Sequence, residues 1–177
     1  MMKKINLIIF GVIILIGFMY FVFLQFKEKN SLIAKEEKIN RISEDTWKCL
    51  NQSRNMVLYS LEPYSRDMEF AKKDVVFHEF KVLGSLWIEN QDLQTKIANE
   101  IKRAVSEVDK DFANCFWPRH GVRVSDEKSV YDFLICYQCN TLYLFKDEGK
   151  KREIVIGGTV NFLNEILINA KVPLPAQ

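Results

Sequence analysis

The longest apolar run of the chain lies near its start, at Ile5–Phe26, and includes no charged residue. Only Asn6 and Gln25 within it are strongly polar. A helix of this length reaches about 33 Å, which is enough to cross a hydrocarbon core of about 30 Å. The run ends in large aromatic residues and lacks the small residues that precede a signal-peptide cleavage site. It therefore predicts an uncleaved transmembrane anchor within residues 1–26, with the lipid bilayer as a partner.

Two arguments from the charges around this run predict opposite sides of the membrane for the rest of the chain. Two lysines precede the run and five basic residues follow it closely, namely Lys27, Lys29, Lys35, Lys38 and Arg41. The positive-inside rule therefore favours a cytoplasmic domain. A short basic tail before an apolar core is typical of an export signal, however, and long domains translocate despite their charge. We expect a single-pass membrane protein whose C-terminal domain is extracytoplasmic.

The next segment, residues 27–55, is polar and rich in charge. Its apolar residues are spaced mostly by three to five positions, as in an amphipathic helix, at Leu32, Ile39, Ile42, Trp47 and Leu50. This pattern predicts a helical stem between the anchor and a domain at residues 56–177.

Within residues 56–177 the apolar pattern alternates between the periods of strands and helices. Strand patterns occur at 56–61, 80–88, 121–125, 130–137, 141–145 and 152–156. Helix patterns occur twice: one begins after Asn90 and extends to Phe112, and the other begins near Thr159. Short polar turns join the later strands, as in antiparallel hairpins. We expect an α+β domain with an antiparallel sheet of five or six strands and two or more helices on one face.

The balance of charges argues against nucleic acid as a partner. Two of the 25 basic residues lie in the first 26 positions, so the remaining chain has 23 basic residues against 23 acidic ones. No basic stripe interrupts this balance, and the sequence gives no electrostatic reason to expect nucleic acid as a partner.

Four residues form a candidate site: Cys115 and His120 in one motif, and Cys136 and Cys139 in a C-x-x-C motif. Three interpretations remain open. The four side chains could bind a metal such as zinc, although Cys-x4-His is an unusual spacing for one half of a zinc site. Some of the cysteines could form a structural disulfide in an oxidising compartment. They could also be buried apolar groups, with His120 closing a loop by hydrogen bonding.

Catalysis is the alternative to these structural roles. A redox C-x-x-C pair needs a helix behind it to lower the pKa of its thiol, and a strand pattern follows Cys139 instead. Cys115 activated by His120 would be a nucleophile without a recognisable third group.

Two arginines, Arg119 and Arg123, flank the loop that contains His120 and are candidate anion contacts. Asn140 is a candidate for the left-handed backbone conformation after the C-x-x-C turn.

These motifs resemble those of a group of uncharacterised bacterial domains that are membrane-anchored or carried by lipoproteins. The shared pattern comprises LYSLxP, VLG, CFxPRHGxR, ICxxC and a final helix followed by GVPL, and it covers about residues 56–175. Lys171 stands where the pattern has glycine. The resemblance implies a bacterial envelope location. It also implies that Arg119 belongs to the same cluster as the cysteines and His120, but it implies no activity. The sequence thus favours a membrane-anchored envelope protein with a structural Cys/His cluster over a thiol-dependent enzyme.

Overall fold

The computed structural model describes residues 15–30, 42–53, 55–65, 74–107, 113–147 and 149–176. The chain divides into two compact units, Met1–Lys38 and Ile39–Gln177. In the first unit residues 15–30 are helical, and residues 5–14 of the expected anchor lie outside the described residues. Over the described ranges, no helix has both the length and the apolar content needed to cross a membrane.

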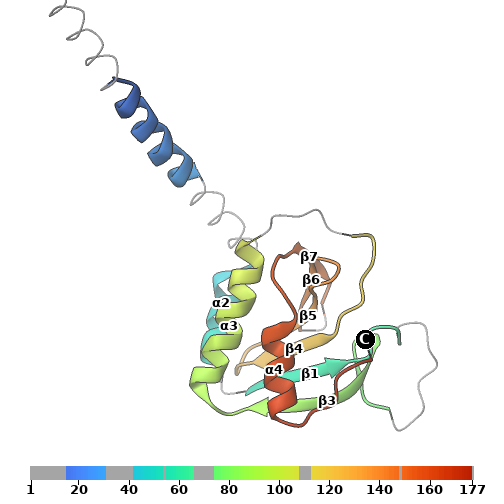
Figure 1. The fold of residues 1–177 in the computed structure, drawn as a ribbon. Coiled ribbons are helices and arrows are strands. Elements are labelled where there is room, and N and C mark those ends of the chain that lie inside the picture. The colour runs from blue at the N-terminus through green and yellow to red at the C-terminus, as the bar shows by residue number, and fades with distance from the viewer. Residues whose placement is uncertain are drawn as a thin grey trace, which may run out of the picture. The chain divides into compact units, whose positions relative to one another are not determined.

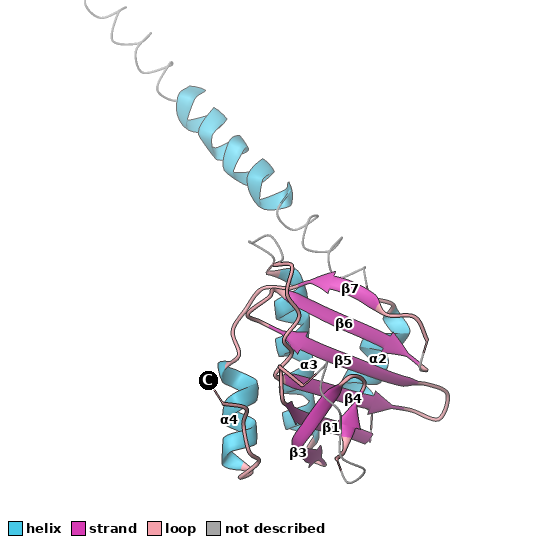
Figure 2. Cartoon of the chain, turned by 90° about the vertical axis from the view of Figure 1, so that its right-hand side faces the viewer, coloured by secondary structure: helices cyan, strands magenta, loops and turns pink. Residues whose placement is uncertain are grey.

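An antiparallel sheet organises the second unit (Figure 2). Its strands are β1 (Asn55–Leu61), β2 (Val76–Phe77), β3 (Phe80–Ile88), β4 (His120–Ser125), β5 (Val130–Cys136), β6 (Thr141–Lys146) and β7 (Arg152–Val155). The strand order is β2-β3-β1-β4-β5-β6-β7, so strands β4 to β7 form the expected meander. At seven strands within the described ranges, the sheet is larger than the five or six predicted. The difference is β2, whose two residues are too short to show an alternating pattern.

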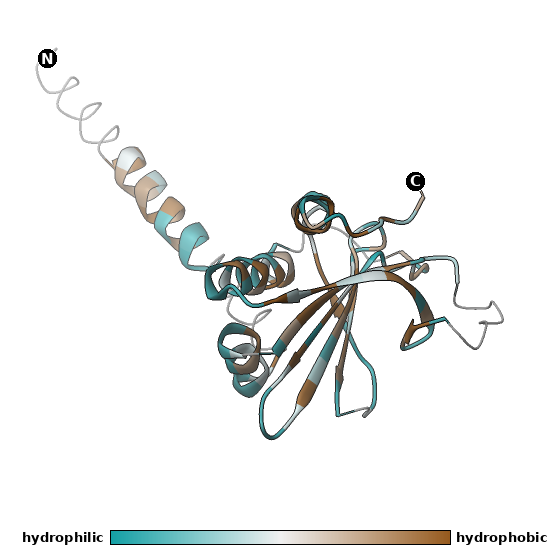
Figure 3. Cartoon of the chain, turned by 90° about the horizontal axis from the view of Figure 1, so that it is seen from below, coloured by the Kyte–Doolittle hydropathy of each residue, from teal (hydrophilic) through white to brown (hydrophobic). Residues whose placement is uncertain are grey.

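Three helices cover one face of this sheet (Figures 1 and 3). They are α2 (Glu44–Gln52), α3 (Gln91–Ser106) and α4 (Asn161–Asn169). The Asn90 side chain accepts a hydrogen bond from the Leu93 N–H, which confirms the predicted start of α3. The predicted continuation of that helix, residues 108–112, lies outside the described part of the chain.

The main core lies between these helices and the sheet. Alternate residues of β1, β4 and β5 face it, because side chains in a strand alternate between the two faces. Fully buried members include Leu50, Leu58, Ile97, Ile101, Val122, Phe133, Leu163 and Leu167. α2 falls within the segment expected to be a stem, yet Cys49 and Leu50 are buried in this core.

A second apolar cluster covers the opposite face of the sheet. It contains Leu61, Phe77, Phe80, Phe116, Leu134, Cys136 and Cys139. The turn between β2 and β3 folds over this face, and the Phe77 ring lies against Gly121 of β4. A Cβ atom at Gly121 would be 2.6 Å from Phe77 Cε1, so only glycine admits this close packing.

Candidate functional site

The loop of residues 113–119 forms one wall of a cavity at the end of β4 and β5. A disulfide joins its Cys115 to Cys139 in the turn after β5, with the two Cα atoms 5.8 Å apart. The Ala113 N–H also donates a hydrogen bond to the Cys139 carbonyl, and the Arg119 carbonyl accepts one from the Leu61 N–H. Covalent and backbone bonds therefore fix this loop at both ends.

The turn between β5 and β6 forms the second wall. It contains Cys136 to Asn140, and Asn140 adopts the predicted left-handed conformation, with a φ of 52°. The Cys139 N–H lies 3.2 Å from Cys136 Sγ, and burial raises the pKa of the Cys136 thiol. Cys136 is free and buried, so it remains protonated and unreactive at neutral pH.

The third wall is the segment Gly157–Val160, which leads into α4. The Gly157 N–H donates to the Ala104 carbonyl near the end of α3, at 2.7 Å. Gly158 has a φ of 95°, and a side chain there would meet Arg103 and the ring of Tyr137. This segment therefore depends on its two glycines to lie this close to α3 and β5.

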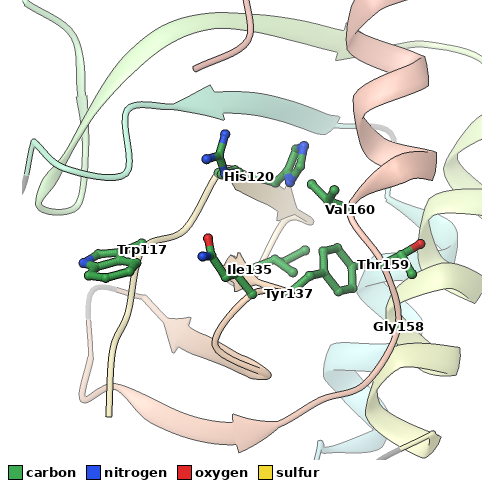
Figure 4. Close-up of a pocket in the computed structure, with 9 residues that line it drawn as sticks. Trp117, His120, Ile135, Tyr137, Gly158, Thr159 and Val160 are labelled. Atoms are coloured by element: carbon green, nitrogen blue, oxygen red, sulfur yellow. The ribbon is translucent and has the colours of Figure 1, made fainter. Parts of the chain in front are cut away.

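The three walls enclose a cavity of about 290 Å³. Its lining residues are Trp117, Arg119, His120, Ile135, Tyr137, Gln138, Gly158, Thr159 and Val160. Figure 4 shows His120 beside Val160, with Trp117 on the opposite side and Ile135 and Tyr137 between them. The lining combines apolar and aromatic surface with a few polar groups, as is typical of small-molecule sites.

His120 is the most deeply buried polar residue of this lining, with 0% of its surface exposed. Its Nε2 atom lies 2.9 Å from the Asn164 side-chain oxygen of α4, so Nε2 carries the proton and donates. Burial lowers the pKa of His120 to about 4, and the nearby Arg119 guanidinium contributes to this shift. The imidazole is therefore neutral at physiological pH, and its Nδ1 is a hydrogen-bond acceptor without a partner among the described residues.

Arg119 provides the positive charge of the lining. One of its N–H groups donates to the Ala176 carbonyl at 3.2 Å, and a guanidinium has five such groups. The lining contains no carboxylate, and Tyr137 directs its hydroxyl away to Glu100, at 3.3 Å. These groups can bind a ligand, but they do not form a nucleophile–base pair.

The predicted metal site is only partly assembled. Cys115 and Cys139 are joined to each other, Cys136 lies beside Cys139, and His120 bonds to Asn164. Within the described ranges, no three His, Cys, Asp or Glu side chains are grouped so as to hold a metal ion. Of the three interpretations of the cluster, the structure shows a disulfide for Cys115 and Cys139 and a buried free thiol for Cys136. Zinc binding remains a prediction.

The thiol-enzyme alternative meets a similar obstacle. Cys115 and Cys139 have no free thiol while the disulfide is intact. The C-x-x-C turn is followed by strand β6, as predicted, so no helix N-terminus lies behind either cysteine to activate it.

The two candidate anion contacts lie apart. Arg123 points to the opposite face of the sheet, where it donates to both oxygens of Asp132 at 2.7 and 2.6 Å. His78, in the turn after β2, also bonds to Asp132 at 2.9 Å and stacks on Phe145. This cluster fastens the β2–β3 hairpin to the sheet and leaves only Arg119 at the cavity.

Several of these residues could not be assigned to a site from the sequence. Trp117, Tyr137 and Gln138 stand at variable positions of the CFxPRHGxR and ICxxC motifs, and Thr159 lies outside the motifs. Only the packing of distant segments brings these residues together. Asp132 did carry a signal, because a single carboxylate in the apolar strand VYDFLIC must find a partner when buried.

No family model matches the chain, and no curated protein or solved structure is significantly similar to it.

Proposed function

We propose that this protein is a membrane-tethered, extracytoplasmic binding protein that holds a small ligand in the cavity beside His120. The observation that carries the proposal is the Cys115–Cys139 disulfide, because it joins two walls of that cavity. A cross-link at this position preorganises the site, which reduces the entropy lost on binding. Structural disulfides persist in oxidising compartments, which supports a location outside the cytoplasm.

The exposed helix at residues 15–30 supports the tether. Its large apolar side chains are mostly exposed on all sides, with Phe18 at 65% and Phe23 at 62%. A helix that is apolar all round is stable in a membrane or a protein core, and this one belongs to a unit separate from the domain. Together with the apolar run that precedes it, the helix fits a bilayer anchor.

The character of the lining supports binding rather than catalysis. His120 is neutral and fixed by Asn164, and Cys115 is cross-linked. An enzyme of the thiol type would need one of these groups free to transfer a proton or attack a substrate.

Fragment screening by NMR tests the binding function on the full chain in detergent micelles. Fragments that bind should shift the amide signals of Trp117, Arg119 and His120 together with those of residues 137–138 and 157–160. The same titration of the protein with its disulfide reduced should give weaker binding, because the two walls are no longer joined. Fragments that bind only elsewhere, or none that bind, would contradict the proposal.

Cysteine labelling in intact cells tests the compartment. A membrane-impermeant maleimide, applied after a mild reductant that does not cross the membrane, should label Cys115, which is partly exposed, whereas Cys139 is buried in the folded domain. Labelling only after cell lysis would place the domain in the cytoplasm. A chain with Cys49 and Cys136 replaced by serine supplies the matched control, since every label then reports the disulfide.

A further inference from the structure

The cavity carries an exposed indole, Trp117, on a rigid loop. Its chain neighbours Phe116 and Pro118 are both buried. Because the residues on either side of it point into the protein, the Trp117 side chain projects outward and stays 41% exposed. The Cys115–Cys139 disulfide fixes the same loop. Trp117 therefore adds little to the core and presents a preorganised apolar surface at the cavity.

A second exposed ring, Tyr64, lies beside Trp117. The two ring centroids are 5.4 Å apart, the ring planes are tilted by 57°, and Tyr64 is 57% exposed. The next residue, Ser65, is buried, and its hydroxyl donates to the Glu62 carbonyl at 2.7 Å and accepts from the Lys81 N–H at 2.8 Å. The turn that carries Tyr64 is therefore fixed as well. Two adjoining large rings that stay in water on rigid turns are typical of a binding surface.

The polar groups of the cavity suit a ligand with several hydroxyl groups. Gln138 and Thr159 are exposed members of the lining, and an amide and a hydroxyl each donate and accept hydrogen bonds. The Arg119 guanidinium supplies further donors. None of the described lining residues has a carboxylate, so the site offers no counter-charge to a cationic ligand.

We infer that this surface binds an oligosaccharide of β-1,4-linked rings, with one ring in the cavity against Trp117 and the next on Tyr64. A pyranose with equatorial hydroxyls has a flat face of C–H groups that can stack on an aromatic ring, and its hydroxyls point outward to polar side chains. The tilt between the aromatic planes favours consecutive rings over one flat base held between parallel rings.

The size of the cavity agrees with a single ring at Trp117. Its volume of about 290 Å³ lies at the lower end of small-molecule pockets, which span about 300–1,000 Å³. A longer ligand must therefore continue outside the cavity, and Tyr64 is the aromatic surface next to Trp117. This inference rests on the proposed binding function and names its ligand class.

Packing offers the competing explanation for the aromatic pair. If Tyr64 served only to hold Trp117 in place, Tyr64→Leu would displace the indole and weaken the binding of one sugar ring and of several rings alike. Under the oligosaccharide inference, Tyr64→Leu weakens only the binding of ligands long enough to reach it.

Titration of the full chain with cellotetraose, D-glucose, adenosine and tetraproline tests the inference, in micelles of a detergent without a sugar headgroup. We expect cellotetraose to bind at least about fivefold more tightly than each of the other three, because only it can stack on both aromatic rings and bond to the polar lining. In NMR spectra, binding should shift the indole N–H signal of Trp117 and leave that of Trp87 unchanged. Equal or tighter binding of adenosine, tetraproline or glucose would overturn the inference.

Variants assign the two contacts. Trp117→Leu should weaken the binding of both cellotetraose and glucose, by about threefold to tenfold, whereas Tyr64→Leu should do so for cellotetraose alone. The matched control is Trp87→Leu, because Trp87 is an exposed tryptophan outside the lining, and affinity there should change less than about twofold. Equal losses in Trp87→Leu and Trp117→Leu would overturn the inference. If other fragments bind the cavity and cellotetraose does not, the oligosaccharide inference fails while the binding function stands.

Discussion

His120 resists protonation in the folded state, and the consequence can be measured through pH. Its pKa is about 4 in the folded chain, because burial disfavours the charged form, against 6.5 when it is unfolded. The unfolded state therefore binds the extra proton first as pH falls. Stability is complete above about pH 6.5 and decreases down to about pH 4, by about 3 kcal/mol in total.

Urea unfolding between pH 7.5 and 4.5 checks this prediction. The His120→Gln variant is the control, because it retains a polar side chain and does not titrate. The wild-type free energy of unfolding should fall more steeply with decreasing pH than that of the variant. Parallel pH profiles would show that His120 has an ordinary pKa in the folded protein.

His78 combines a backbone role with a side-chain role, and two substitutions separate them. Its φ of 54° is unfavourable for most residues but tolerated by asparagine, and its ring bonds to Asp132. We expect His78→Asn to lower the free energy of unfolding by about 1–3 kcal/mol, the contribution of a hydrogen bond to a charged group. His78→Ala should cost about 1 kcal/mol more. Equal losses in urea unfolding would mean that the left-handed backbone carries no penalty.

The pairing of cysteines shows what single residues could and could not indicate. The strand pattern after the C-x-x-C motif correctly predicted β6 in place of a helix, since that prediction depends on local sequence. The partner of Cys139 is Cys115, 24 residues earlier, and no local pattern identifies a contact at that separation. Likewise, the Asp132 carboxylate signalled a buried partner without showing that His78 and Arg123 would share it.

At the scale of elements, Gly157 is the position where the cavity wall meets α3. A Cβ atom at this residue would overlap the Glu107 carbonyl oxygen, and backbone on both sides limits relaxation. We predict that Gly157→Ala lowers the free energy of unfolding by about 1–3 kcal/mol and displaces the start of α4. Thr159→Ala, an exposed residue of the same segment, should change stability by less than about 0.5 kcal/mol.

Paired urea unfolding and NMR spectra of the two variants test this prediction. Shifts in the amides of residues 158–162 should accompany the loss of stability in Gly157→Ala. An unperturbed Gly157→Ala protein would mean that the segment does not pack against α3 as closely as described.

The periodicity of the sequence predicted most of the strands and helices, but it did not predict how they are arranged in the sheet. The strands that became β3 to β7 alternate or are apolar over several residues, and α3 has a capping residue and a long amphipathic pattern. β1 precedes β3 in the chain yet lies between β3 and β4 in the sheet. That order depends on pairing across the whole of α3, which the local pattern does not encode. The cavity depends on the same long-range pairing, because its walls come from three distant segments.

At the scale of the whole molecule, the disulfide links the 113–119 loop to the sheet and stabilises the domain through the unfolded state. Closing a loop of this length removes chain entropy worth about 3–4 kcal/mol in the simplest treatment. We therefore expect the Cys115→Ser/Cys139→Ser double variant to be less stable than the oxidised wild type by about this amount. Full chains in micelles, unfolded by heat and by urea, provide the comparison.

Reduction supplies the matched control, since it breaks the same bond without a substitution. A reductant should lower the stability of the wild type to that of the double variant and leave the double variant unchanged. Thiol titration should rise from two free groups, Cys49 and Cys136, to four in the unfolded wild type. If wild type and double variant unfold alike under oxidising conditions, the disulfide does not stabilise this fold. A cavity that still binds fragments unchanged in the double variant would show that its walls are held by the backbone hydrogen bonds of Ala113 and Leu61 instead.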